Sequence, residues 1–275
     1  MQAGRREMTM HDTDDTSTRP RRRGIYLLPN LFTTGTLFAG FYGIVASIDG
    51  HFQPAAIAVF VAGLLDGMDG RLARLTNTES EFGKQYDSLA DMVAFGMAPA
   101  IIVYQWGLKA LVEYGWAWGK LGWLAAFLYA VAAALRLARF NVTSKTADRR
   151  FFEGLPSPSA AGLVASMVWV AADLDVDGLP TLAVVTALTV LAGALMVSRF
   201  AYWSFKGLSP RGRISFAYVL IIPLIFVLIA LDPPRVCFFL ASTYAMSGIV
   251  VGIWRRWRRQ SGRARRNEQL PPPEE

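Results

Sequence analysis

The sequence predicts an all-α membrane protein, a polytopic bundle of about eight transmembrane helices. Three observations support this class. Of the 275 residues, 53% are apolar and only 18% are charged, and the mean hydropathy is positive. Apolar runs close to the bilayer-spanning length of about 20 residues recur along almost the whole chain. Lys and Arg gather in alternate connections between these runs, as they do in proteins that cross a membrane repeatedly.

The predicted spans form one membrane domain, residues 21–255, which is flanked by two tails. Residues 1–20 are polar and charged, and residues 256–275 are basic and then proline-rich, so both tails are predicted to be disordered. The expected spans are, in chain order, residues 28–48, 53–75, 83–105, 121–140, 157–173, 179–199, 214–231 and 235–254.

The distribution of positive charge predicts how the helices are oriented. The chain holds 28 Lys and Arg residues, and all but Lys109, Lys120 and Arg235 fall on the side of the membrane that also holds both termini. Because cytoplasmic connections are the ones enriched in Lys and Arg, both termini are predicted to be cytoplasmic. The net charge of +7 is then explained by topology and by weak contacts with anionic membrane lipids, and no nucleic-acid partner is expected.

Four carboxylates lie inside predicted spans, where a charge facing lipid costs a few kcal/mol or more. Asp66 and Asp69 lie three residues apart in the second span, and Asp87 and Asp91 lie four apart in the third, so each pair shares one helix face. The short connection around residues 76–80 makes the two helices antiparallel neighbours. We therefore expect the acidic faces to converge near the cytoplasmic end of the bundle.

Converging carboxylates repel one another unless cations lie between them. A ligand set made only of oxygen atoms favours hard divalent ions such as Mg²⁺ or Mn²⁺, and a two-ion site suits phosphoryl chemistry. Gly70 and Gly83 have no side chain to keep a bulky ligand away from the helix backbone. Arg74, about 12 Å along the helix from Asp66, is placed to meet a phosphate or a base.

Two other interpretations of the acids remain open at this point. The acids could form salt bridges that hold the helices together, although Arg74 and Lys84 are too few to neutralise four charges. They could also line the ion pathway of a coupled transporter, although transporters usually place such sites near the membrane midplane. The predicted acidic faces lie toward the cytoplasmic end instead.

The spacing of these residues resembles the signature of the CDP-alcohol phosphatidyltransferase family. All eight specified positions match over a run of 26 residues, which makes an accidental match very unlikely; the run is Asp66-x2-Asp69-Gly70-x2-Ala73-Arg74-x8-Gly83-x3-Asp87-x3-Asp91. The resemblance implies a lipid donor activated by cytidine diphosphate, a pair of divalent metal ions and an alcohol acceptor. It also favours a homodimer in a bacterial inner membrane, with the active site facing the cytoplasm.

The resemblance implies a role for each matched residue. Asp66, Asp69 and Asp87 correspond to metal ligands. Asp91 corresponds to a further metal ligand, and it is also the candidate general base on the acceptor hydroxyl. The positions expected to line the CDP moiety are Gly70, Ala73, Arg74 and Gly83.

Flanking stretches resemble the branch of the family whose acceptor is L-serine and whose donor is CDP-diacylglycerol. These stretches are residues 26–30, 87–100, 135–141 and 154–158. Arg136, Arg139 and Asn141 are the candidate serine contacts, because an arginine fork suits a carboxylate. The two arginines could equally be topological anchors or phosphate contacts, and glycerol 3-phosphate or inositol phosphate would need similar partners. A sister transferase that uses one of those acceptors is therefore the alternative.

The positions of the histidines indicate whether the reaction passes through a covalent enzyme intermediate. The only two histidines, His11 and His51, fall in the N-terminal tail and in the first extracytoplasmic turn, where neither can reach a cytoplasmic site. This excludes the unrelated phospholipase-D-like enzymes, which need two His-x-Lys motifs. The expected reaction is direct attack of the acceptor hydroxyl on the β-phosphorus, with no enzyme-bound intermediate.

Overall fold

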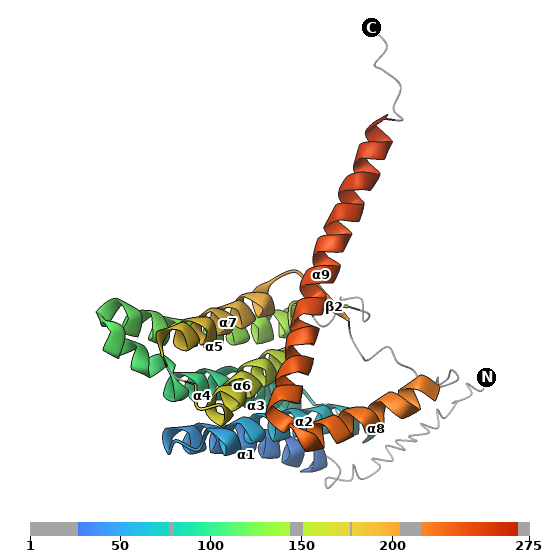
Figure 1. The fold of residues 1–275 in the computed structure, drawn as a ribbon. Helices are drawn as coiled ribbons and strands as arrows, with labels where there is room; N and C mark the ends of the chain where they lie inside the picture. Colours follow the sequence, from blue (N-terminus) through green and yellow to red (C-terminus); the bar gives the residue numbers. More distant parts are fainter. Residues whose placement is uncertain (1–26, 77–79, 144–150, 177, 204–215, 269–275) are drawn as a thin grey trace, which may run out of the picture.

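The structure is a computed structural model, and it is helical almost throughout the residues that it describes (Figure 1). Those residues are 27–76, 80–143, 151–176, 178–203 and 216–268. The predicted helical class is confirmed. The predicted N-terminal tail, residues 1–20, lies outside the described residues.

Helices occupy nearly all of the described part of each segment that the sequence predicts to span the membrane. Five helical segments of the described chain are long and apolar enough to cross a membrane, judged by length and composition: Asn30–Ile48, Glu81–Tyr114, Trp116–Val142, Leu179–Val197 and Pro233–Gly252. The elements are α1 Leu27–Ile48, α2 Phe52–Thr76, α3 Glu81–Asp91, the π-helix η2 Met92–Met97, α4 Ala98–Trp106, the 3₁₀-helix η3 Leu108–Tyr114, α5 Trp116–Thr143, α6 Ser157–Asp173, α7 Leu179–Val197, α8 Phe216–Leu231 and α9 Pro233–Glu268.

Helix α9 extends beyond the point where the sequence predicts a disordered tail. The prediction places the end of the fold at residue 255, whereas α9 continues to Glu268. The added residues are mostly Arg, Gln, Glu and Ala, which have high helix propensity. The first proline after them is Pro271, so nothing in the covalent chain stops the helix earlier.

The third predicted span is not one uniform α-helix, because η2 interrupts it. Pro99 has no N–H to donate to the carbonyl of Phe95, four residues earlier. In η2 the N–H of Ala98 bonds to the carbonyl of Val93, five residues back. The Phe95 carbonyl instead accepts a hydrogen bond of 3.1 Å from the buried hydroxyl of Tyr129 on α5. The π-helix begins at Met92, so the change in helix type comes directly after Asp91.

Helix α6 forms the centre of the bundle. It contacts α2, α4, α7 and α9, and Figure 1 shows it between α1 and α2 on one side and α5 and α7 on the other. Every residue from Ala160 to Trp169 is buried. Half of these ten residues are Gly, Ala or Ser, which lets neighbouring helices approach closely.

A short ribbon joins two connections at one end of the bundle. Strand β1 (Phe151–Glu153), which follows α5, pairs antiparallel with β2 (Ala201–Trp203), which follows α7. Gly154 continues the link, because its N–H donates to the Phe200 carbonyl at 2.8 Å while its φ of +83° is one that glycine adopts readily. The hydroxyl of Tyr202 in β2 donates to the Ala245 carbonyl of α9 at 3.0 Å. The connections after α5 and α7 therefore lie on the same side, as the charge distribution predicts.

Gly40 brings α1 against η2, and this contact leads to a stability prediction. A Cβ atom at Gly40 would lie 2.6 Å from Ala94 Cα and 2.9 Å from Ala94 Cβ. We expect Gly40→Ala to destabilise the protein by about 1–3 kcal/mol through overpacking, measured as a lower thermal unfolding temperature in detergent. Gly63→Ala is the control, because its Cβ would meet only Phe95 Cε1 at 3.9 Å. Equal unfolding temperatures for the two variants would contradict the argument.

Candidate metal centre

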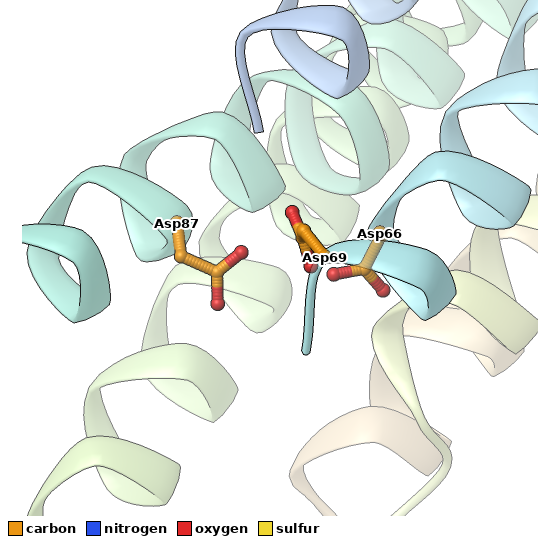
Figure 2. A group of neighbouring side chains, drawn as sticks. All are labelled: Asp66, Asp69 and Asp87. Atoms are coloured by element: carbon orange, nitrogen blue, oxygen red, sulfur yellow. The ribbon is translucent and has the colours of Figure 1, made fainter. Parts of the chain in front are cut away.

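Three aspartates from two helices meet inside one end of the bundle. Asp66 and Asp69 come from α2 and Asp87 comes from α3, and each offers a carboxylate oxygen that lies within 4.8 Å of the other two. Figure 2 shows Asp87 facing the α2 pair across the gap between the two helices. Asp69 is buried at 5% exposure, and the other two are half-buried. The predicted convergence of the acidic faces is found for these three residues.

Local sequence determines how the three side chains reach one place. The spacing of three residues puts Asp66 and Asp69 one turn apart on the same face of α2. Helix α3 begins at a defined point, because the Ser80 hydroxyl caps it by accepting the N–H of Gly83 at 3.0 Å. This cap places Asp87 in the second turn of α3, opposite the α2 pair.

Asp91 lies beside this group but is not a member of it. Its carboxyl group is within hydrogen-bonding reach of Asp66, and its Oδ1 atom is buried with no hydrogen-bond partner among the described residues. A buried carboxylate oxygen without a donor is costly unless a cation or a substrate proton meets it. The side chain is thus available for a ligand that approaches the other three acids.

The donor set suits a divalent metal ion better than a salt-bridge network. All the converging atoms are carboxylate oxygens, which are the ligands that hard cations prefer. Lys84, a cation close to them in the sequence, forms an exposed ion pair of 3.1 Å with Glu81. Asp66, Asp69 and Asp87 could therefore hold a metal ion between α2 and α3.

The residues expected to line the CDP moiety differ in what surrounds them. Gly70 is exposed, and a Cβ atom there would meet nothing within 4 Å, so a ligand can approach its backbone. At Gly83 a Cβ atom would lie 3.1 Å from the Ser80 hydroxyl, so that glycine also makes room for the helix cap. The side chains of Ala73 and Arg74 lie outside the described part of the structure.

The candidate serine contacts on α5 separate into an inner and an outer position. Arg136 Nη1 donates to the buried Ser157 hydroxyl at the start of α6 at 2.7 Å. Its Nε atom is buried without a hydrogen-bond partner among the described residues, and Asp91 and Tyr244 lie close enough to interact with its charge. Asn141 is exposed at the outer position, and its amide donates to Ser88 Oγ at 3.0 Å. Arg139 is half-buried.

Sequence reasoning missed three residues near the site. Thr33 of α1 donates from its hydroxyl to Asp69 Oδ2 at 2.9 Å, and the only sequence signal is a hydroxyl in an apolar span. Ser157 lies in the stretch of residues 154–158 singled out above, which was the available signal for it. Tyr244 of α9 lies 108 positions beyond Arg136 in the chain, and nothing in the sequence pattern points to it.

The fold and the site together define a multi-pass helical membrane protein with an acidic centre that could hold a metal ion inside one end of its bundle. The family model described as CDP-alcohol phosphatidyltransferase matches residues 26–198. The chain belongs to this family of transferases.

Curated relatives are similar to part of the chain. A Helicobacter pylori (strain ATCC 700392 / 26695) protein named CDP-diacylglycerol--serine O-phosphatidyltransferase is 37% identical over 203 residues, which cover 74% of this chain and 83% of the relative. A Mycobacterium leprae (strain TN) protein of the same name is 38% identical over 161 residues, covering 55% of this chain and 51% of the relative. An archaetidylserine synthase of Methanothermobacter thermautotrophicus is 38% identical over 141 residues, covering 50% and 56%.

Metal removal should change the thermal stability of the protein in a way that depends on Asp87. Without a cation the carboxylates repel one another, so in EDTA at neutral pH we expect Asp87→Asn to unfold at a temperature equal to or above that of the wild type. Saturating Mn²⁺ should reverse the order, since a ligand at about 100 times its Kd stabilises by about 2.7 kcal/mol.

Asp49→Asn is the matched control for this measurement. Asp49 is exposed in the turn between α1 and α2, at the end of α2 remote from the centre, so its variant should gain as much stability from Mn²⁺ as the wild type. An equal gain for Asp87→Asn would remove Asp87 from the metal centre.

Proposed function

We propose that this chain transfers the phosphatidyl group of CDP-diacylglycerol to L-serine, which yields phosphatidylserine and CMP. The observation that carries the proposal is the convergence of the Asp66, Asp69 and Asp87 carboxylates, each of which offers an oxygen within 4.8 Å of the other two. Membership in the CDP-alcohol phosphatidyltransferase family supports the donor. The names of the Helicobacter and Mycobacterium relatives support serine as the acceptor.

In this proposal the diphosphate of the donor lies at the acidic centre. Asp66, Asp69 and Asp87 would hold one or two Mg²⁺ or Mn²⁺ ions, with Asp91 completing the ligand set. When bound, the ions would supply positive charge for the diphosphate oxygens and for the leaving CMP. The exposed backbone at Gly70 leaves space for the nucleotide, and the other proposed contacts of the CDP moiety are Ala73, Arg74 and Gly83.

The chemical step is a displacement at the β-phosphorus. The serine hydroxyl oxygen forms a bond to this phosphorus while the bond to the bridging oxygen breaks and CMP leaves. Asp91 is the proposed general base, because its buried Oδ1 has no other partner among the described residues and can accept the hydroxyl proton.

Arg136 is the proposed contact of the serine carboxylate. Ser157 fixes one end of the guanidinium through Nη1, which leaves the buried Nε as a donor. A guanidinium held in this way is preorganised for a planar carboxylate. Arg139 and Asn141 would act at the entrance, where Asn141 already bonds to Ser88 on α3.

The proposed setting is a bacterial inner membrane crossed eight times, with both termini and the active site facing the cytoplasm. The charge distribution supports this orientation, and the β1–β2 ribbon supports a common side for the connections after α5 and α7. CDP-diacylglycerol would enter from the bilayer with its acyl chains left in lipid, and serine would enter from the cytoplasm. A homodimer is proposed on family likeness alone.

The purified protein should release CMP from CDP-diacylglycerol only when both a divalent metal ion and serine are present. We expect Asp91→Asn to lower kcat by about 10²–10⁴-fold, the usual contribution of a general base. CMP formation, measured in parallel with serine, glycerol 3-phosphate and inositol phosphate, tests the acceptor. Release with a phosphorylated alcohol instead of serine would keep the metal centre and replace the acceptor.

Arg136→Gln should erase the preference for an acceptor that carries a carboxylate. Serinol has the same amine and hydroxyl as serine but no carboxylate. We expect kcat/KM for serine to fall by about 10–100-fold, because hydrogen bonds to charged groups contribute about 1.5–3 kcal/mol, while the low kcat/KM for serinol stays unchanged. An equal fall for both acceptors would assign Arg136 to the donor phosphate, and the same measurement on Arg139→Gln compares the two arginines.

A further inference from the structure

Thr33 reaches the acidic centre from a helix that carries none of the motif residues. It lies in α1, it is buried at 4% exposure, and its hydroxyl donates to Asp69 Oδ2 at 2.9 Å. Asp69 in turn is the most buried of the three clustered aspartates. The contact therefore joins a third helix to a centre otherwise built from α2 and α3.

Hydrogen bonds of this kind restrict how a carboxylate can bind a cation. The Asp69 carboxylate accepts both the Thr33 hydroxyl and the backbone N–H of Gly70. One donor is a buried side-chain hydroxyl and the other is a backbone N–H, and together they restrict the orientation of the carboxylate.

A second buried threonine on α1 shows what an uninvolved hydroxyl does in the same environment. Thr36 lies one turn beyond Thr33 and is buried at 1% exposure. Its hydroxyl donates to the Phe32 carbonyl of its own helix at 3.2 Å, which is the usual arrangement for threonine in an apolar helix. Thr36 is therefore a matched control, since it has the same residue type, helix and burial but no contact with the acids.

We infer that Thr33 is a positioning residue that orients the Asp69 carboxylate for the metal ion. This inference rests on the proposed metal centre and deepens it. The Thr33 hydroxyl lowers the free-energy cost of metal binding, because the Asp69 carboxylate is already oriented before the ion binds. Hydrogen-bond partners of metal ligands typically contribute 10- to 100-fold in metal affinity.

The test is a Mn²⁺ titration of the full-length protein in detergent, without donor or acceptor, by calorimetry or by electron paramagnetic resonance. Thr33→Val keeps the shape of the side chain and removes the hydroxyl, and we expect it to weaken Mn²⁺ affinity by about 10–100-fold. Thr33→Ser restores the hydroxyl, so it should bind Mn²⁺ within about threefold of the wild type. Thr36→Val should bind as the wild type does.

A second readout separates a positioning residue from a ligand. High Mn²⁺ should restore turnover to Thr33→Val, because the missing hydroxyl changes the affinity and not the set of ligands. It should not restore turnover to Asp69→Asn. Thermal unfolding in EDTA establishes that each variant is folded, and Thr33→Ser keeps the comparison interpretable if Thr33→Val unfolds.

Three outcomes would overturn the inference. They are wild-type Mn²⁺ affinity in Thr33→Val, an equal loss of affinity in Thr36→Val, and failure of Thr33→Ser to restore binding. Asp69→Asn distinguishes these from failure of the metal centre itself. If Asp69→Asn binds Mn²⁺ normally, the centre is misassigned; if it loses binding while Thr33→Val keeps it, only the role of Thr33 is wrong.

Discussion

Mutual repulsion among aspartates inside an apolar bundle is the constraint on which the rest of this structure depends. Asp66, Asp69 and Asp87 are held within 4.8 Å of one another, and Asp91 lies beside Asp66. Charges this close interact strongly where water is scarce. Packing of the surrounding helices has to supply the free energy that holds them together until a cation binds. A functional cation site explains why such an arrangement would be retained.

The helices around the centre meet this constraint through close backbone contacts. Small residues let α1 lie against α2 and η2, as the contact of Gly40 with Ala94 illustrates. The π-helix follows Asp91 directly, and the Tyr129 hydroxyl satisfies the Phe95 carbonyl that Pro99 leaves without a donor. The irregular backbone is thus compensated by α5, and α3 ends with its last carboxylate turned toward the centre.

The metal-binding half of the site could be predicted from the sequence, whereas the groups that orient it could not. Asp66, Asp69 and Asp87 lie in two consecutive helices joined by a short connection, so helical periodicity alone brings their faces together. Thr33 reaches Asp69 from the preceding helix α1, and Tyr244 approaches Arg136 from the distant helix α9. Neither helix carries a polar pattern that predicts which residue these side chains meet. Asn141 was predicted beside Arg136 as a serine contact, but the two point to different partners, Ser88 and Ser157.

The sequence by itself determined the helical membrane class, the approximate bounds of the helices and the acidic pairs of α2 and α3, because these follow from local composition and helical spacing. The π-helix after Asp91, the β1–β2 ribbon and the length of α9 were not expected. Only the tertiary structure decided that Asp91 lies beside Asp66, that Thr33 bonds to Asp69, and that Arg136 is anchored by Ser157. The reason is physical: local pattern specifies which face of a helix is polar, but contacts between distant helices depend on how the whole bundle packs.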